Sequence, residues 1–90
     1  MRLEKQLTII NKLGLHARAA TQLAKLAQTF NAEITIIQGE KSASAASVLG
    51  LMMLESSQGK EVTVVSEGDD AQDALNAIET LICARFNEDE

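Results

Sequence analysis

The sequence predicts an α+β domain with the element order βαββαβα, in which three helices cover one face of a four-stranded, mostly antiparallel sheet. Two patterns predict it: apolar residues at helical spacing in long segments, and short alternating segments rich in β-branched residues. The chain has 90 residues, 46% of them apolar and 23% charged. This length and balance are typical of one globular domain, expected to span residues 1–90. Because the second sheet face has no covering layer, the architecture is an open-faced β-sandwich.

Four segments of the chain are predicted to be strands. Residues 4–10 and 61–66 alternate apolar with polar side chains and contain β-branched residues. The same alternation runs through residues 34–36, and a hairpin turn then leads to a short strand at about residues 41–45. Polar side chains in these strands, including that of Lys5, are expected on the open face of the sheet, toward water.

Three segments are predicted to be helices. Residues 17–28 are rich in Ala, Leu, Gln and Lys, and residues 47–54 form a shorter helix with Ser47 as its N-cap. The last helix begins after an acidic turn that ends at Asp70, since Asp favours the positive end of a helix. Its apolar positions give the strongest periodic signal in the chain: Ala71, Ala74, Leu75, Ile78, Leu81 and Ile82. The tail, residues 87–90, is expected to fray.

Charge and residue counts argue against several partners and cofactors. A net charge of −5 and only two aromatic residues argue against nucleic acid as a partner. One His and one Cys cannot supply a disulfide scaffold or a Cys₂His₂ zinc set, so we expect no metal and no cofactor. The charged N-terminus and the lack of an apolar run of about 18 residues argue against export and membrane insertion. We therefore expect a cytoplasmic monomer.

The single histidine, His16, lies between a glycine turn and the first predicted helix. The first N–H groups of a helix have no helical acceptor and carry a partial positive charge, so they bind anions. Arg18 adds a planar, permanently charged donor for phosphate oxygens. With the backbone N–H groups of Ala17 and Arg18, these groups would hold an anion beside a nucleophilic nitrogen, which suits phosphorylation of the imidazole. From the residues alone, the alternative is a polar helix start with a solvated arginine.

Apolar side chains around this histidine predict a docking surface for a partner protein. In the short second helix, Leu51 and Leu54 can face the sheet while its other apolar residues point elsewhere. An exposed apolar patch with a basic rim that includes Arg18 would mark a docking site for an acidic partner. We expect these residues to contact the partner: Ala20, Ala24, Lys25, Val48, Leu49 and Met52. The alternative is that they pack in the core.

Two segments resemble the signatures of the HPr phosphocarrier family. Residues 11–20, Asn-Lys-Leu-Gly-Leu-His-Ala-Arg-Ala-Ala, resemble the phosphohistidine signature G-L-H-x-R-P-A, and residues 41–47, Lys-Ser-Ala-Ser-Ala-Ala-Ser, resemble the second signature. The resemblance covers nearly the whole chain and implies the same βαββαβα fold. It also implies that His16, supported by Arg18, accepts a phosphoryl group from enzyme I, which is charged by phosphoenolpyruvate. The group would then pass to a histidine of an enzyme IIA partner.

Within that family, residues 46–59 resemble the nitrogen-branch members, called NPr, although sugar-branch HPr proteins share parts of this segment. Ser47 matches the serine that a regulatory kinase phosphorylates in some members; an N-cap role is the alternative. Ala19 stands where the family usually has Pro. Because Pro fixes φ and lacks an N–H, Ala at this position leaves the first turn of the helix less restrained.

A different class of protein also fits the predicted element order. Ferredoxin-like regulatory domains, which bind a small metabolite or dimerise, have a βαββαβ order. Such a domain would not need His16, so ligand binding that survives its removal would distinguish the two classes.

Overall fold

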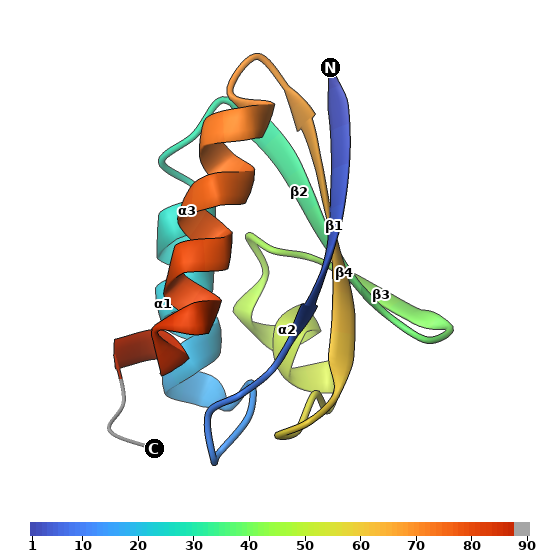
Figure 1. Ribbon diagram of the computed structural model, residues 1–90, viewed down its shortest axis with the longest axis vertical. Helices are drawn as coiled ribbons and strands as arrows, with labels where there is room; N and C mark the ends of the chain where they lie inside the picture. Colours follow the sequence, from blue (N-terminus) through green and yellow to red (C-terminus); the bar gives the residue numbers. More distant parts are fainter. Residues whose placement is uncertain (88–90) are drawn as a thin grey trace.

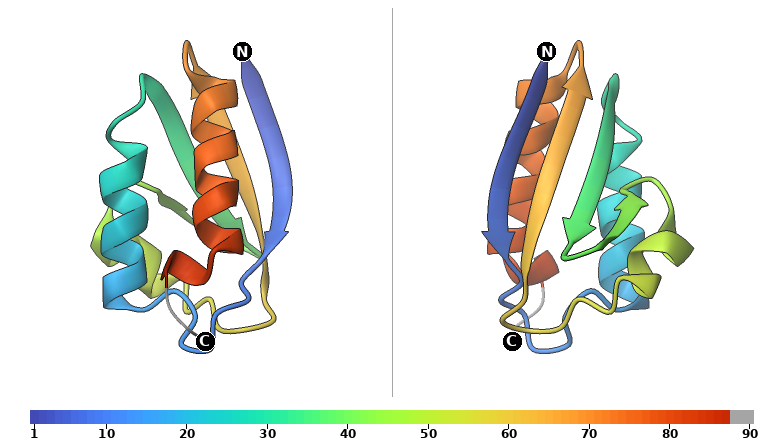
Figure 2. Two further views of the ribbon diagram at one scale, coloured as in Figure 1. Left: turned by 60° about the vertical axis from the view of Figure 1, so that its left-hand side comes forward. Right: turned by 90° about the vertical axis from the view of Figure 1, so that its right-hand side faces the viewer.

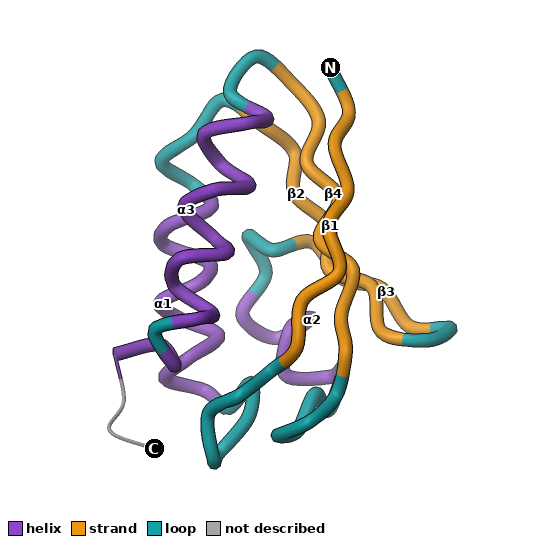
Figure 3. Tube along the Cα trace, in the orientation of Figure 1, coloured by secondary structure: helices purple, strands orange, loops and turns teal. Residues whose placement is uncertain are grey.

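The computed structural model, which describes residues 1–87, has two layers, with the helices on one side of a sheet whose other side is open (Figure 1). The sheet contains four strands: β1 Arg2–Thr8, β2 Ala32–Gln38, β3 Lys41–Ser44 and β4 Glu61–Gly68. Every neighbouring pair is antiparallel, and the spatial order is β1-β4-β2-β3. Figure 3 shows the strands in orange on one side of the molecule and α1 and α3 in purple on the other. The predicted fold class is therefore confirmed.

Three helices and a terminal turn complete the described chain: α1 Ala17–Ala27, α2 Val48–Met53, α3 Ala71–Cys83 and the 3-10 turn η1 Arg85–Asn87. The two views of Figure 2 show α1 and α3 running along the sheet and the short α2 beside β3. The predicted element order is confirmed, and element ends differ by about two residues. The acidic residues 88–90 lie outside the described residues.

The first strand begins earlier than the sequence pattern predicts. Its ladder with β4 runs from the Arg2–Glu67 pair to the Thr8–Glu61 pair. Ile9 follows the strand and is held by the loop before β4: its N–H donates to Lys60 O at 2.9 Å, and its carbonyl accepts from the Gly59 N–H at 2.8 Å. The chain directly after β1 is thereby tied to the loop that leads into β4.

The core lies between the inner sheet face and the apolar sides of α1 and α3. Helical spacing on α3 predicts its buried side correctly, with Leu81 only partly buried. The largest fully buried side chains include these: Ile9, Leu23, Ile36, Leu51, Leu54, Val62, Val64, Ile78, Ile82 and Phe86. Among residues 1–87, no helix is both long and apolar enough to cross a bilayer.

Lys5 is not on the open face, so that prediction is wrong. Side chains alternate along a strand, and Leu7, two residues on, is buried against the helices. Lys5 therefore points to the helical side, where its Nζ lies 2.6 Å from Glu79 Oε2 of α3. Its long stem covers apolar surface while the charged end reaches a partner at the edge of the layer.

Phe86 is a core residue that the periodic pattern does not reveal. The chain turns sharply after α3, with positive φ at Arg85, Phe86 and Asn87. This turn folds the Phe86 ring back into the core, where it is 1% exposed. The side chain of Asn87 then donates to Gln22 Oε1 of α1 at 3.2 Å, so the end of the described chain lies beside the first helix.

Candidate functional site

The loop that leads into α1 depends on a glycine. Gly14 has φ +66°, and a Cβ atom there would lie 2.5 Å from Ser56 O and 2.8 Å from Ser57 Cα. Both contacts are with backbone, which could not move aside cheaply. The next residue, Leu15, donates its N–H to the same Ser56 oxygen at 2.8 Å. A side chain at Gly14 would therefore separate the two loops and shift the residues that follow.

Further hydrogen bonds hold this loop from within. The buried Asn11 side chain donates to Gly14 O at 2.7 Å, and the Gly14 N–H donates to Asn11 O at 3.1 Å. Gln58 Nε2 donates to Ile10 O at 3.1 Å from the neighbouring loop. The path of the chain into α1 is thus set by both loops rather than by residues 9–15 alone.

His16 occupies the N-cap position of α1, which confirms its predicted place. Its backbone is extended, with φ −84° and ψ −179°, and the first helical hydrogen bond runs from the Ala20 N–H to His16 O at 2.8 Å. The N–H groups of Ala17, Arg18 and Ala19 precede that bond, so they have no acceptor within the helix. The half-buried imidazole therefore stands beside backbone donors at the positive end of an 11-residue helix.

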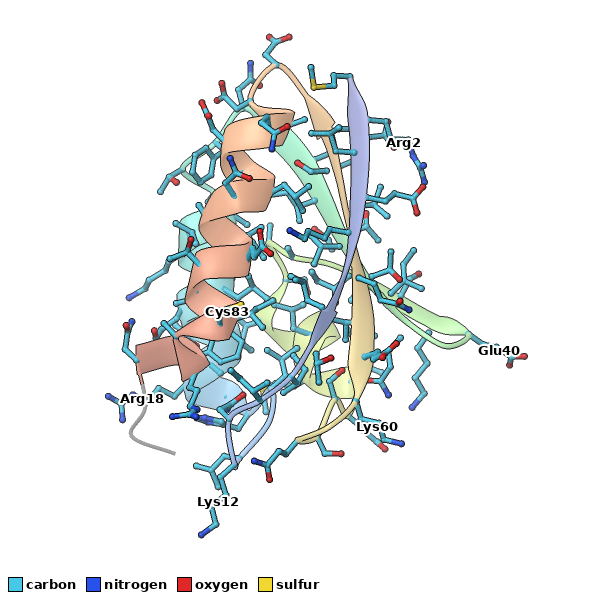
Figure 4. The ribbon with its side chains drawn as sticks, viewed as in Figure 1. Arg2, Lys12, Arg18, Glu40, Lys60 and Cys83 are labelled. Carbon is cyan, nitrogen blue, oxygen red and sulfur yellow. The ribbon has the colours of Figure 1, made fainter. Side chains whose placement is uncertain are left out.

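Positive side chains lie near His16 and along the exposed side of α1. Figure 4 shows Arg18 and Lys12 where β1 ends and α1 begins. Lys25 is exposed in the last turn of α1, seven residues after Arg18 and hence on the same side of the helix. The net charge of the chain is −5, so this local basic surface is what an acidic partner or a phosphate would meet.

The imidazole lines a shallow hollow between the two loops. The other lining residues are Leu13, Leu15, Glu55, Ser56 and Ser57. Ser56 is buried, and its hydroxyl donates to the side chain of Gln38 at the end of β2. One wall of the hollow is thereby fixed to the sheet, while the exposed Leu13 and Glu55 stand at its rim.

The predicted docking residues divide between surface and core. Leu49 and Met52 of α2 are 72% and 41% exposed, Lys25 is exposed and Val48 is half-buried. Leu51 and Leu54 face the core, as predicted. Two residues are wrongly placed by the sequence analysis: Ala20 is fully buried and Ala24 is 2% exposed, because both lie on the side of α1 that packs in the core.

Met53 is an exposed apolar residue that the sequence analysis missed. It is 66% exposed, and with Leu49 and Met52 it forms an apolar surface on α2, the α2 patch. These residues have the spacing i, i+3, i+4, so they share one helical side. A second stripe, through Leu51, faces the core. A short helix that is apolar on both sides cannot bury both in a domain of this size, and that signal could have identified Met53.

Ser47 caps α2, as its sequence position predicts. Its Oγ accepts a hydrogen bond from the Gly50 N–H at 3.0 Å, and its N–H donates to Ser44 O. This satisfies one of the backbone donors that a helix start leaves open. The hydroxyl is also exposed at the edge of the α2 patch.

These features make up a candidate anion site around one nucleophilic side chain. A half-buried imidazole, open backbone N–H groups and an arginine two residues on are held by a clamped loop, with an exposed apolar surface nearby. Such a site can hold a phosphoryl group close to an imidazole nitrogen. A phosphate-handling histidine protein with a helix-covered antiparallel sheet is the class of protein that these observations describe.

Comparisons with known proteins identify the family. A family model described as the PTS HPr component phosphorylation site matches residues 3–84. The chain is 64% identical over 87 residues to the phosphocarrier protein NPr of Shewanella violacea, covering 97% of this chain and 96% of that protein. It is 42% identical over 88 residues to the phosphocarrier protein HPr of Cupriavidus necator, covering 98% and 99%.

A solved structure agrees with this assignment. The crystal structure of HPr from Thermoanaerobacter tengcongensis superposes with a TM-score of 0.93 at 38% identity, covering 98% of this chain and 99% of that one. The chain therefore belongs to the HPr phosphocarrier family of the phosphotransferase system. The chain is therefore not a ferredoxin-like regulatory domain, which was the alternative class. Of the two curated relatives described, the NPr protein is the more similar.

Proposed function

We propose that this chain is a phosphohistidine carrier that accepts a phosphoryl group on His16 and passes it to another protein. The donor is an enzyme I-type phosphotransferase, charged by phosphoenolpyruvate, and the acceptor is an enzyme IIA-type protein. One observation carries the proposal: His16 stands at the N-cap of α1, beside the open backbone N–H groups of Ala17 and Arg18. The carrier works only with these partners and is not a self-sufficient catalyst.

The transfer step exchanges one bond to phosphorus for another. A ring nitrogen of His16 attacks the phosphorus of the phosphorylated donor while the donor's bond to phosphorus breaks, and that electron pair returns to the donor atom. The helix N–H groups and the Arg18 guanidinium stabilise the negative oxygens during the transfer. Transfer to the acceptor is the same step with His16 as the leaving group.

The site is tested by loading the chain with enzyme I and labelled phosphoenolpyruvate. We expect an acid-labile, base-stable phosphate on the protein, complete loss of label in His16→Ala, and slower labelling in Arg18→Ala. Circular dichroism should show that both variants remain folded, since both side chains lie outside the core. A chain that stays unlabelled while a control HPr is labelled would overturn the proposal.

We also assign the carrier to the nitrogen-related branch of the system. The support is the 64% identity to the NPr of Shewanella violacea, together with the NPr-like segment at residues 46–59. Phosphoryl transfer from the sugar-branch and nitrogen-branch enzyme I types, measured side by side, tests the assignment. A higher kcat/KM with the sugar-branch enzyme would make the chain a sugar-branch HPr instead.

The docking surface that we propose consists of the α2 patch, the adjoining Val48 and the basic residues Arg18 and Lys25. Its apolar part is exposed on a short helix near the imidazole, and its basic part lies along α1. A partner with an acidic surface around an apolar depression fits this arrangement. We further propose that the carrier is a monomer and that it is located in the cytoplasm. Sedimentation equilibrium would test the oligomeric state.

Ser47 is the residue at which we propose regulation of that docking surface. Its exposed hydroxyl adjoins the half-buried Val48 and the exposed Leu49. A phosphate there would place about two negative charges at the edge of an apolar contact, which disfavours docking. Ser47→Asp should slow transfer from enzyme I, whereas Ser47→Thr, which retains an N-cap hydroxyl, should not. Equal rates for the two variants would limit Ser47 to its capping role.

A further inference from the structure

Glu55 has an unusual backbone conformation directly beside the His16 hollow. It follows the C-cap of α2, Leu54, and has φ +55°, while its N–H donates to Met52 O at 3.2 Å. Helices commonly place glycine at this position, because a side chain disfavours the left-handed conformation. The chain therefore has a glutamate at a helix-end position where glycine is preferred.

Contacts within the protein do not offset that strain. Among residues 1–87, the Glu55 carboxylate has no hydrogen bond or ion pair, and the residue is exposed. Some other carboxylates are engaged: Glu67 pairs with Arg2, and Glu79 pairs with Lys5. A left-handed backbone conformation at a residue other than glycine is a reason to look for a functional role.

The position of Glu55 suggests that role. It lines the hollow that contains the imidazole, and it also lines a groove of about 480 Å³ between β3 and α2. The groove is mainly apolar, and Gly50, Met53 and Lys41 also line it. Glu55 therefore lies between the phosphate site and the apolar part of the docking surface.

The charges around the phosphoryl site are arranged asymmetrically. Arg18 on α1 and Lys12 on the preceding loop supply positive charge, whereas Glu55, after α2, brings a negative charge to the rim of the hollow. A phosphoryl group is itself negative, so a nearby carboxylate repels it unless a positive charge stands between them. A partner that brings such a charge removes the repulsion, and a partner without one does not.

We propose that Glu55 is a specificity-determining residue, which restricts phosphoryl exchange to protein partners that present a Lys or Arg beside their reacting histidine. The proposal rests on the proposed function of His16 as phosphoryl acceptor. Glu55 takes no part in the bond changes described above. It discriminates by a repulsion that only the matching partner relieves.

The test compares two phosphorylated donors, the sugar-branch and the nitrogen-branch enzyme I, by their kcat/KM toward each variant. In Glu55→Gln, we expect kcat/KM to fall about fivefold for the better donor and its salt dependence to weaken, because one interfacial charge pair is lost. For the poorer donor we expect kcat/KM to rise, because the repulsion that this donor does not relieve is removed. The ratio of the two kcat/KM values therefore narrows. Glu55→Lys should narrow the ratio further.

Two control variants separate selectivity from total charge and from stability. Glu40→Gln makes the same change of charge at the tip of the β2–β3 hairpin, which Figure 4 shows projecting away from Arg18 and Lys12, and should leave the ratio unchanged. Glu55→Gly removes the backbone strain, so it should raise the thermal unfolding midpoint. It should also narrow the ratio of the two kcat/KM values as much as Glu55→Gln does.

A ratio that stays within about twofold of the unsubstituted chain in Glu55→Gln and Glu55→Gly, with normal loading, would overturn the role of Glu55 and leave the carrier function intact. Equal narrowing in Glu40→Gln would also overturn it, since the effect would then depend only on total charge. An unsubstituted chain that accepts no phosphoryl group from either donor would overturn the proposed function, and this inference with it.

Discussion

The two helices α2 and α3 use apolar residues in opposite ways. The 13-residue α3 buries one apolar side, and its exposed positions include Gln72, Asn76 and Thr80. The six-residue α2 buries Leu51 and leaves Leu49, Met52 and Met53 exposed. Apolar side chains on α3 stabilise the fold, whereas most of those on α2 cannot. The contrast supports the proposal that α2 contacts a partner protein, because an exposed apolar patch is typical of an interaction site.

The contrast predicts the largest loss of stability on α3. Ile78→Ala removes a fully buried side chain from its centre. We expect the free energy of unfolding to fall by about 2–5 kcal/mol, because the lost burial adds to the energy of the cavity left behind. Urea denaturation measures this change. Loss of less than about 1 kcal/mol would mean that α3 is not the main stabilising helix.

Leu49→Ser on α2 should have the opposite pattern of effects, with little change in stability and a clear loss of phosphoryl transfer. The side chain is 72% exposed, so the free energy of unfolding should change by less than about 0.5 kcal/mol. Transfer from enzyme I should slow about tenfold in kcat/KM, since a central apolar contact is removed. Thr80→Ser, on the exposed side of α3, is the matched control and should alter neither quantity. An unchanged kcat/KM in Leu49→Ser would contradict the docking role of the α2 patch.

Ser47→Ala should weaken α2 locally. It removes the hydroxyl that accepts from the Gly50 N–H, at a cost of about 1 kcal/mol. Hydrogen exchange should quicken in α2 more than in α3, because the short helix has few other contacts to hold it. Equal changes in both helices would indicate that they unfold as one unit. Ser47→Thr keeps a capping hydroxyl and should restore most of the protection.

The smallest change in the free energy of unfolding is expected at the start of α1, the helix that lies with α2 and α3 on one side of the sheet. The Ala19 N–H has no acceptor within the helix, so Ala19→Pro loses no helical hydrogen bond. By restricting the unfolded chain, it should raise the free energy of unfolding by about 0.5 kcal/mol. Because Ala19 is fully buried, a decrease would show that the proline ring does not fit. Thermal and urea unfolding together measure the change.

Local patterns were sufficient to predict the elements and much of the candidate site. The spacing on α3 identifies its buried side because helix periodicity is a local property. His16 at the start of α1 and the Ser47 cap follow equally from neighbouring residues. Phe86 was missed because its burial depends on a left-handed turn after α3, for which no periodic signal exists.

Side-chain direction was predicted less well wherever it depends on packing between distant segments. Alanines such as Ala20 and Ala24 occur in interfaces and in cores alike, and only the packing of α1 against α2 and α3 shows that these two are buried. Lys5 was assigned to the wrong face because its charge suggested water, whereas strand alternation and Glu79 place it toward α3.

The sequence by itself determined the order of the elements, the fold class and the position of His16 and Arg18 at the start of a helix. These depend on residues close together in the chain, where propensity and periodicity act. Only the tertiary structure decided why Gly14 has no room for a side chain and that Glu55 lines the His16 hollow. Those properties arise where loops some 40 residues apart meet, as Gly14 and Ser56 do.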